Sequence, residues 1–160
     1  MRLKKFVSAA AAAAMVSALL AVLSPTAAHA ASSYKLKNAG GRYVTVSGTY
    51  LVMGSSTNLT FTDCCGEGNY LTLWNTSSNK NLGLSGNSTA SGTRAVLAAG
   101  SSSNTQDWQW DPATLTTFQL KNRANPNMCL GISGGQTGTN VAIFACATGQ
   151  IPNNQLWLRA

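Results

Sequence analysis

Short segments in which apolar and polar residues alternate begin near residue 34, and three kinds of segment recur in the same order along the chain. Members of the first kind end in Asn, and members of the second kind end in Ser-Gly. The copies of the three kinds are, in turn, 34–38, 71–75 and 118–122; 44–48, 82–86 and 130–134; and 57–61, 93–97 and 139–143. This ordered recurrence predicts one domain built from three copies of a unit.

Alternation with a period of two, bounded by Gly, Ser and Asn, predicts that each segment is a β-strand with one buried face. The buried positions should be, copy by copy, Leu36, Leu73 and Leu120; Val44, Leu82 and Leu130; Val46, Leu84 and Ile132; Leu59, Ala95 and Val141; and Phe61, Leu97 and Ile143. Half-buried hairpins cannot cover their own apolar faces, so the three units must close around a shared axis. We therefore predict an all-β chain, a β-trefoil rather than a sandwich, with repeats at about 34–70, 71–117 and 118–160.

The first repeat is abbreviated. Val44 and Leu82 are 38 positions apart, whereas Leu82 and Leu130 are 48 positions apart. This alignment places the missing length, about that of one hairpin, just after Cys64-Cys65, and two interpretations stay open. Either the first repeat lacks its fourth strand, or the segment 71–75 serves two repeats.

The first 30 residues have the pattern of an export signal. Basic residues within the first five positions precede an apolar run at 9–23, and Ala-His-Ala at 28–30 supplies the small residues that signal peptidase requires. The apolar run is too short and wrongly flanked for a membrane-spanning helix. We therefore expect cleavage near Ala30, a mature chain of 31–160, a secreted, extracellular location and no membrane insertion.

Charge is sparse after the signal. The part from residue 31 keeps eight of the eleven Lys and Arg residues and all four acidic residues, so its formal net charge is +4. The basic residues are dispersed and form no run, which argues against a nucleic-acid partner. A length of about 130 residues suits a single domain with one core.

The third repeat carries the most specific motifs, which are Cys129-Leu-Gly-Ile, Val-Ala-Ile-Phe-Ala-Cys at 141–146, and Gln155-Leu-Trp157. The second repeat contains Gln106-Asp-Trp108, and Thr72-Leu-Trp74 stands for this motif in the first. Together these residues resemble the ricin B-type (Gln-x-Trp) β-trefoil lectin domain family, as a secreted, bacterial member. The resemblance implies that Trp108 and Trp157 are structural, which agrees with the need of a buried indole N–H for a partner.

The resemblance also implies where a sugar would bind. Ricin-type sites combine an acidic residue that accepts hydrogen bonds from paired hydroxyls, an aromatic ring that stacks on the sugar, and an Asn. In the third repeat the ring is Phe144 and the amide is Asn154, with Gln155 beside it, while Gly131 stands at the acidic position. The corresponding residues are Gly83, Ala98 and Thr105 in the second repeat, and Thr45 and Thr62 in the first. All three repeats therefore lack the carboxylate, and only the third has the ring.

Four cysteines follow the signal. The resemblance pairs Cys129 with Cys146 in a disulfide, which export into an oxidising space favours. Cys64 aligns with Cys146, but Tyr43 occupies the position of its partner. Cys64 and Cys65 can form a vicinal disulfide, pair between chains or stay free.

Catalysis lacks suitable residues in this sequence. The single histidine, His29, lies in the signal, so no Ser-His-Asp triad, Cys-His pair or histidine zinc site can form in the mature chain. The four carboxylates, which are Asp63, Glu67, Asp107 and Asp111, do not form a recognisable glycosidase pair. No phosphate-binding Gly-rich motif is present. We expect no enzyme activity, no metal and no cofactor.

Two functions remain. The first is a secreted carbohydrate-binding module with at most one weak site, formed in the third repeat by Phe144, Asn154, Gln155 and Gly131 and binding a glycan or polysaccharide. The second is a degenerate trefoil that binds an extracellular protein, as an inhibitor or a toxin accessory subunit, because one scaffold hosts unrelated functions. We expect a monomer in either case.

Overall fold

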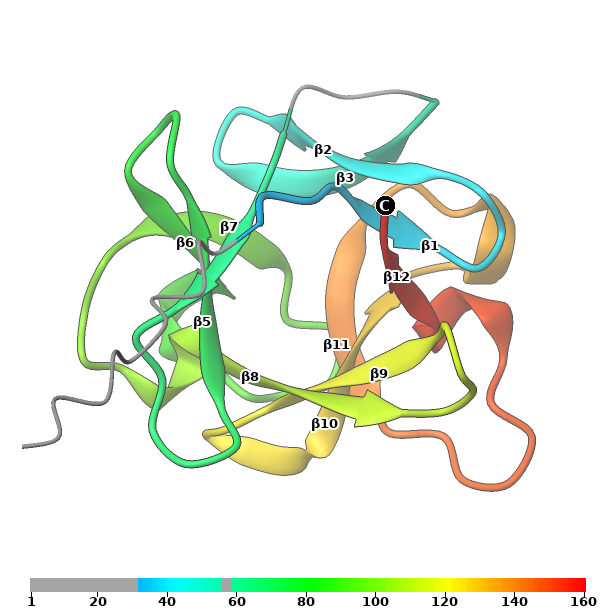
Figure 1. Cartoon of the computed structure of the whole chain (residues 1–160). Coiled ribbons are helices and arrows are strands. Elements are labelled where there is room, and N and C mark those ends of the chain that lie inside the picture. Colours follow the sequence, from blue (N-terminus) through cyan, green and yellow to red (C-terminus); the bar gives the residue numbers. More distant parts are fainter. Residues whose placement is uncertain (1–31, 56–58) are drawn as a thin grey trace, which may run out of the picture.

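The computed structural model describes residues 32–55 and 59–160, and the export signal predicted for residues 1–30 lies outside this part (Figure 1). Within it, the chain forms twelve strands and four short 3-10 helices. The strands are β1 (Leu36–Asn38), β2 (Tyr43–Ser47), β3 (Tyr50–Gly54), β4 (Thr62–Cys64), β5 (Leu71–Asn75), β6 (Lys80–Leu84), β7 (Ala95–Ala99), β8 (Asp107–Pro112), β9 (Phe118–Asn122), β10 (Asn125–Ile132), β11 (Val141–Ala145) and β12 (Trp157–Arg159). The 3-10 helices are η1 (Ser85–Asn87), η2 (Asn104–Gln106), η3 (Gly135–Thr137) and η4 (Asn153–Gln155).

The strands fall into three sets of four that lie around a common centre (Figure 1). In each set the second and third strands form an antiparallel hairpin, as β2–β3, β6–β7 and β10–β11. Fourth strands join neighbouring sets, because β4 pairs with β5, β8 with β5 and β9, and β12 with β9 and β1. First and fourth strands thus close a barrel and the hairpins cover one end of it. The predicted all-β trefoil is confirmed.

Leucines from the three first strands and the hairpins form the core. Leu36, Leu73 and Leu120 are fully buried, as are Val44, Leu82 and Leu130 at the start of the hairpins. Burial of each such side chain contributes about 1.5–3 kcal/mol. Val46 is the exception to the predicted set, since it is 40% exposed.

A buried asparagine ends each first strand. The side chains of Asn38, Asn75 and Asn122 are at most 1% exposed. Each Nδ2 donates to a backbone carbonyl just before the fourth strand of the preceding repeat around the barrel, for example from Asn75 to Thr60 O at 2.7 Å. Each Oδ1 accepts from an amide of the following turn, so the buried polar atoms are paired.

The two Gln-x-Trp tryptophans are fully buried under the hairpins. The indole N–H of Trp108 donates to Leu82 O and that of Trp157 donates to Leu130 O, both at 2.9 Å. Each bond therefore joins a fourth strand to the second strand of the same repeat. Phe61 takes the corresponding place in the first repeat. It forms an antiparallel bridge with Tyr34, just as Trp157 of the third repeat pairs with Phe118.

This register corrects the alignment of the first repeat. The third strand is β3, which the sequence pattern missed, and the segment around Phe61 leads into the fourth strand β4. Leu59 and Phe61 stand where Gln and Trp stand in the other repeats. The prediction of Thr72-Leu-Trp74 as that motif was wrong, since these residues form the first strand β5 of the second repeat.

The first repeat keeps its fourth strand, so neither interpretation of its short length is correct. Most of the shortening lies in the β2–β3 turn, where only Gly48 and Thr49 connect Ser47 to Tyr50. In the second and third repeats, residues 85–94 and 133–140 make the same connection. Gly48 has a φ of +64°, which suits a tight hairpin turn. The short turn also leaves Val46 without a covering loop.

Aromatic and charged residues close the barrel end away from the hairpins. Asp63, Trp110 and Arg159 each lie two residues after the buried ring of their fourth strand. Arg159 pairs with Asp63 and lies over Trp110, 4.2 Å from the ring centroid, while the Tyr34 hydroxyl donates to Asp63. Burial raises the pKa of Tyr34 far above its usual range, and the Asp63 carboxylate raises that pKa further.

We expect Trp108→Phe to lower the free energy of unfolding by about 1–3 kcal/mol, because Leu82 O loses its buried donor. Urea denaturation at constant pH measures this. Trp74→Phe is the matched control, since Trp74 is only half-buried and bonds Asn79 at the surface; it should change stability by less than about 0.5 kcal/mol. Equal losses in both variants would contradict the assigned register.

The buried Tyr34 predicts a loss of stability at alkaline pH. Tyrosines ionise near pH 10 in the unfolded chain, whereas Tyr34 keeps its proton in the folded state, so the free energy of unfolding falls as pH rises above about 10. Tyr34→Phe removes this ionisable group, so the free energy of unfolding should fall less steeply with pH, by up to about 1.4 kcal/mol per pH unit. Urea titrations of the wild type and Tyr34→Phe between pH 8 and 11 measure the difference. Identical slopes would contradict the assignment.

Candidate functional site

The four residues predicted for the third-repeat site lie together. Gly131 is buried in β10, Phe144 lies in β11, and Asn154 and Gln155 belong to η4. A Cβ placed on Gly131 would lie 3.1 Å from Phe144 Cδ2, 3.3 Å from Gln155 Cγ and 3.4 Å from Asn154 O. The half-buried Phe144 ring therefore covers the strand position at which ricin-type sites carry their carboxylate.

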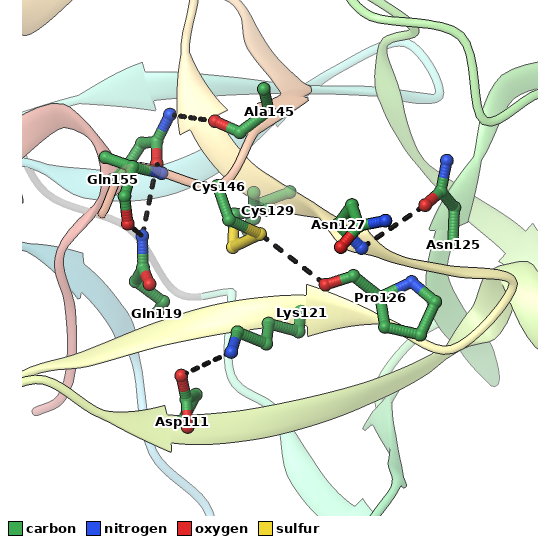
Figure 2. Close-up of a disulfide and its surroundings, with 12 residues drawn as sticks. Asp111, Gln119, Lys121, Asn125, Pro126, Asn127, Cys129, Ala145, Cys146 and Gln155 are labelled. Atoms are coloured by element: carbon green, nitrogen blue, oxygen red, sulfur yellow. Dashed lines mark hydrogen bonds and ion pairs between the residues drawn. A yellow bond between two sulfur atoms is a disulfide. The ribbon is translucent and has the colours of Figure 1, made fainter.

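Gln155 has its polar atoms engaged within the protein. Its Nε2 donates to Ala145 O at 3.0 Å, and its Oε1 accepts from Ala147 N at 2.9 Å and from Gln119 Nε2 at 3.2 Å. Figure 2 shows this chain of bonds beside the disulfide. Gln106 does the same in the second repeat, where it bonds Ala99 O and Ser101 N. The Gln of the motif thus fastens the end of the third strand to the helix before the fourth strand.

Asn154 and Phe144 are the two predicted site residues whose side chains still have groups free to contact a ligand. The Asn154 amide donates to Ile132 O at 3.3 Å, while its Oδ1 accepts no hydrogen bond from any residue that the structure describes. Phe144 pairs across the hairpin with Cys129. The site therefore offers one ring face, one amide oxygen and no carboxylate.

The third-repeat disulfide joins Cys129 of β10 to Cys146, the residue after β11, with Cα atoms 4.8 Å apart (Figure 2). It crosslinks the hairpin that carries Gly131 and Phe144. Closing a loop of this length contributes about 3 kcal/mol in the chain-entropy account. The disulfide therefore holds the site's two strands in one register.

The second repeat has a hollow of about 420 Å³ at the corresponding place. Ala98 and Gln106 line it, and Thr105 bonds Asn87 at its edge. Tyr50, which projects from the short β2–β3 hairpin, also borders the hollow and is 38% exposed. The sequence pattern missed Tyr50 because it predicted no strand there. The first-repeat position predicted for the ring, Thr62, is instead buried in β4; its true counterpart is Gly54.

Cys64 and Cys65 are bonded to each other as a vicinal disulfide. Cys64 lies in β4, a fourth strand, so its alignment with Cys146 was wrong. The disulfide lines a polar hollow of about 440 Å³ where the three repeats meet, together with Asp107 and Arg123. No sequence pattern predicts this grouping, because Cys64, Asp107 and Arg123 are far apart in the chain.

A family model described as ricin-type beta-trefoil lectin domain-like matches residues 57–144, more than half of the chain. The chain therefore belongs to this family. Among curated proteins none matches it.

Solved structures with 15–20% identity share the fold. The designed 3-fold symmetric protein ThreeFoil has a TM-score of 0.69 and 20% identity, over 79% of this chain and 96% of its own. A Polyporus squamosus lectin, bound to a human-type influenza-binding epitope, has a TM-score of 0.67 and 17% identity, over 79% of this chain and 48% of its own. An exo-beta-1,3-galactanase from Clostridium thermocellum has a TM-score of 0.69 and 16% identity, over 80% of this chain and 30% of its own. The chain thus spans about half of the lectin and under a third of the galactanase.

Two further properties concern the described residues alone. Residues 32–55 and 59–160 contain no helix long and apolar enough to cross a membrane. The same residues contain no group of three or more His, Cys, Asp or Glu side chains arranged to hold a metal ion.

The contact of Phe144 with Gly131 predicts the effect of adding a side chain there. Gly131→Ala should lower the free energy of unfolding by about 1–3 kcal/mol, because Phe144 and Gln155 must both move. Gly100→Ala is the matched control, since its Cβ would meet only Asn81 Nδ2, at 3.5 Å. Chemical denaturation compares the two variants, and equal stability would show that the ring does not rest on the strand.

Proposed function

We propose that this protein is a secreted carbohydrate-binding module, not an enzyme, with one weak site in its third repeat. The observation that carries the proposal is the Phe144 ring lying over Gly131 beside Asn154. A ring fixed over a strand presents one face for the C–H surface of a sugar. Membership of the lectin-like family supports the same class of ligand.

Because the third-repeat site has no carboxylate, it would recognise a sugar through apolar contact and one neutral hydrogen bond. In this proposal Phe144 supplies apolar contact and Asn154 Oδ1 accepts one hydroxyl, while Gln155 stays bound within the protein. A neutral amide forms a weaker hydrogen bond than a carboxylate does. Affinity for one sugar unit should therefore be low, and repeated units of a polysaccharide would raise retention through avidity.

Export fits the same function. Two disulfides suit an oxidising compartment, and the predicted signal would deliver the chain there. Extracellular glycans and polysaccharides are then the available ligands, and a single domain needs no partner subunit for this role.

Phe144→Ala should weaken binding to any glycan held in the third repeat by at least about tenfold, because stacked apolar area is lost. Isothermal titration against soluble oligosaccharides, with amide chemical shifts of Gly131 and Asn154 followed by NMR, measures affinity and place. Leu115→Ala is the control, since Leu115 is fully exposed on a loop away from the site. A blank across diverse glycans, together with one stable extracellular protein partner, would replace this proposal with the protein-binding alternative.

A further inference from the structure

Two hollows meet at one ion pair on the surface where residues of all three repeats come together. One, of about 440 Å³, is lined by the Cys64–Cys65 disulfide and Asp107; the other, of about 460 Å³, is lined by Tyr70 and Gln109. Glu67 and Arg123 line both. Each hollow has the size of a small-molecule site.

Arg123 is held in place by the protein. Its Nη1 donates to Asp107 Oδ2 at 3.0 Å, and its backbone N–H donates to Asp107 O at 2.9 Å. Asp107 in turn accepts from Thr72 Oγ1 at 2.9 Å, and its side chain is only 15% exposed. The guanidinium is therefore preorganised before any ligand arrives.

Glu67 is the movable member of the ion pair. Its side chain is 78% exposed, against 27% for Arg123. An exposed ion pair contributes little to stability, so Glu67 can exchange part of its contact with Arg123 for ligand hydroxyls at little cost. A carboxylate beside a guanidinium provides an acceptor and donors for two neighbouring hydroxyl groups.

The threefold framework does not require these residues. Arg123 follows the buried Asn122, and the residues in the same place after Asn38 and Asn75 are Ala39 and Thr76. The vicinal disulfide also occurs in the first repeat alone. Two of the chain's four carboxylates nevertheless gather here.

Charge and surface chemistry indicate the ligand. Glu67 and Asp107 outweigh Arg123, so the first hollow carries a net negative charge and disfavours anions. Its other walls are mainly hydroxyl and amide groups, with the disulfide as an apolar surface. The second hollow offers the half-buried Tyr70 ring, whose centroid lies 5.9 Å from the Arg123 guanidinium carbon.

We propose that this double hollow is a second saccharide-binding site, in which Glu67 and Arg123 bind the hydroxyls of a neutral oligosaccharide that reaches from the disulfide to Tyr70. This site is separate from the Phe144 site of the third repeat and does not depend on Phe144. It supplies the carboxylate that the repeat positions lack, and two sites on one domain allow bivalent retention on a polysaccharide.

NMR titration of the ¹⁵N-labelled protein with cellotetraose, chitotetraose and a β-1,3-galactotetraose tests the proposal. We expect at least one of these to shift the amides of Asp107 and Arg123, and Glu67→Gln and Arg123→Gln each to weaken that binding at least tenfold. Lys121→Gln is the matched control, because it breaks the neighbouring ion pair with Asp111 and lies outside both hollows. Its affinity should stay within twofold of wild type.

The outcomes separate the two sites. Binding that survives Glu67→Gln and Arg123→Gln but is lost in Phe144→Ala would overturn this proposal and leave the third-repeat site standing. Binding that survives Phe144→Ala but is lost in the two hollow variants would support this site alone. Absence of shifts with all three oligosaccharides would overturn this proposal. Unchanged thermal unfolding of Glu67→Gln, expected from its exposure, shows that a loss is local.

Discussion

The fold depends on a buried ring at the start of each fourth strand. Trp108 and Trp157 fill the space between barrel and hairpins, and their indole N–H groups hold the second-strand carbonyls of Leu82 and Leu130. These bonds lie where no water can replace them, so each ring fixes the height of its hairpin as well as filling volume. Phe61 fills the first-repeat position without a donor, and the shorter hairpin there is correspondingly more exposed at Val46.

The candidate binding residues lie where the three repeats differ from one another. The glutamines of the Gln-x-Trp motif and the buried asparagines that end the first strands all form hydrogen bonds within the protein. This structural role explains why they recur. Residues available to a ligand occur once each. Phe144 over Gly131 belongs to the third repeat, Tyr50 to the short hairpin of the first, and the Glu67–Arg123 pair to the contact between the first and third repeats. In the proposed second site, the Glu67 carboxylate takes the role for which the three repeat positions have no acidic residue.

The period-two pattern predicts the trefoil because the same core positions are filled three times, as at Leu36, Leu73 and Leu120. The pattern also predicts that Phe144, Asn154 and Gly131 lie close together, because two adjacent strands and the loop after them carry these residues. The pattern misplaces the first repeat because Leu59 and Phe61 mimic an alternating strand, while the true strand β3 has no repeat-like sequence. The Glu67–Arg123 hollow was not predictable, since it depends on β4, β5 and β9 meeting around the barrel.

Hydrogen exchange of the indole N–H groups of Trp74, Trp108 and Trp157 tests whether the buried rings hold the hairpins to the barrel. The Trp108 and Trp157 indoles should exchange only through global unfolding, because both are fully buried and bonded to the hairpins, whereas the Trp74 indole should exchange rapidly from the surface. If the Trp108 or Trp157 indole exchanged as fast as that of Trp74, the rings would not hold the hairpins to the barrel, and the threefold account would be contradicted.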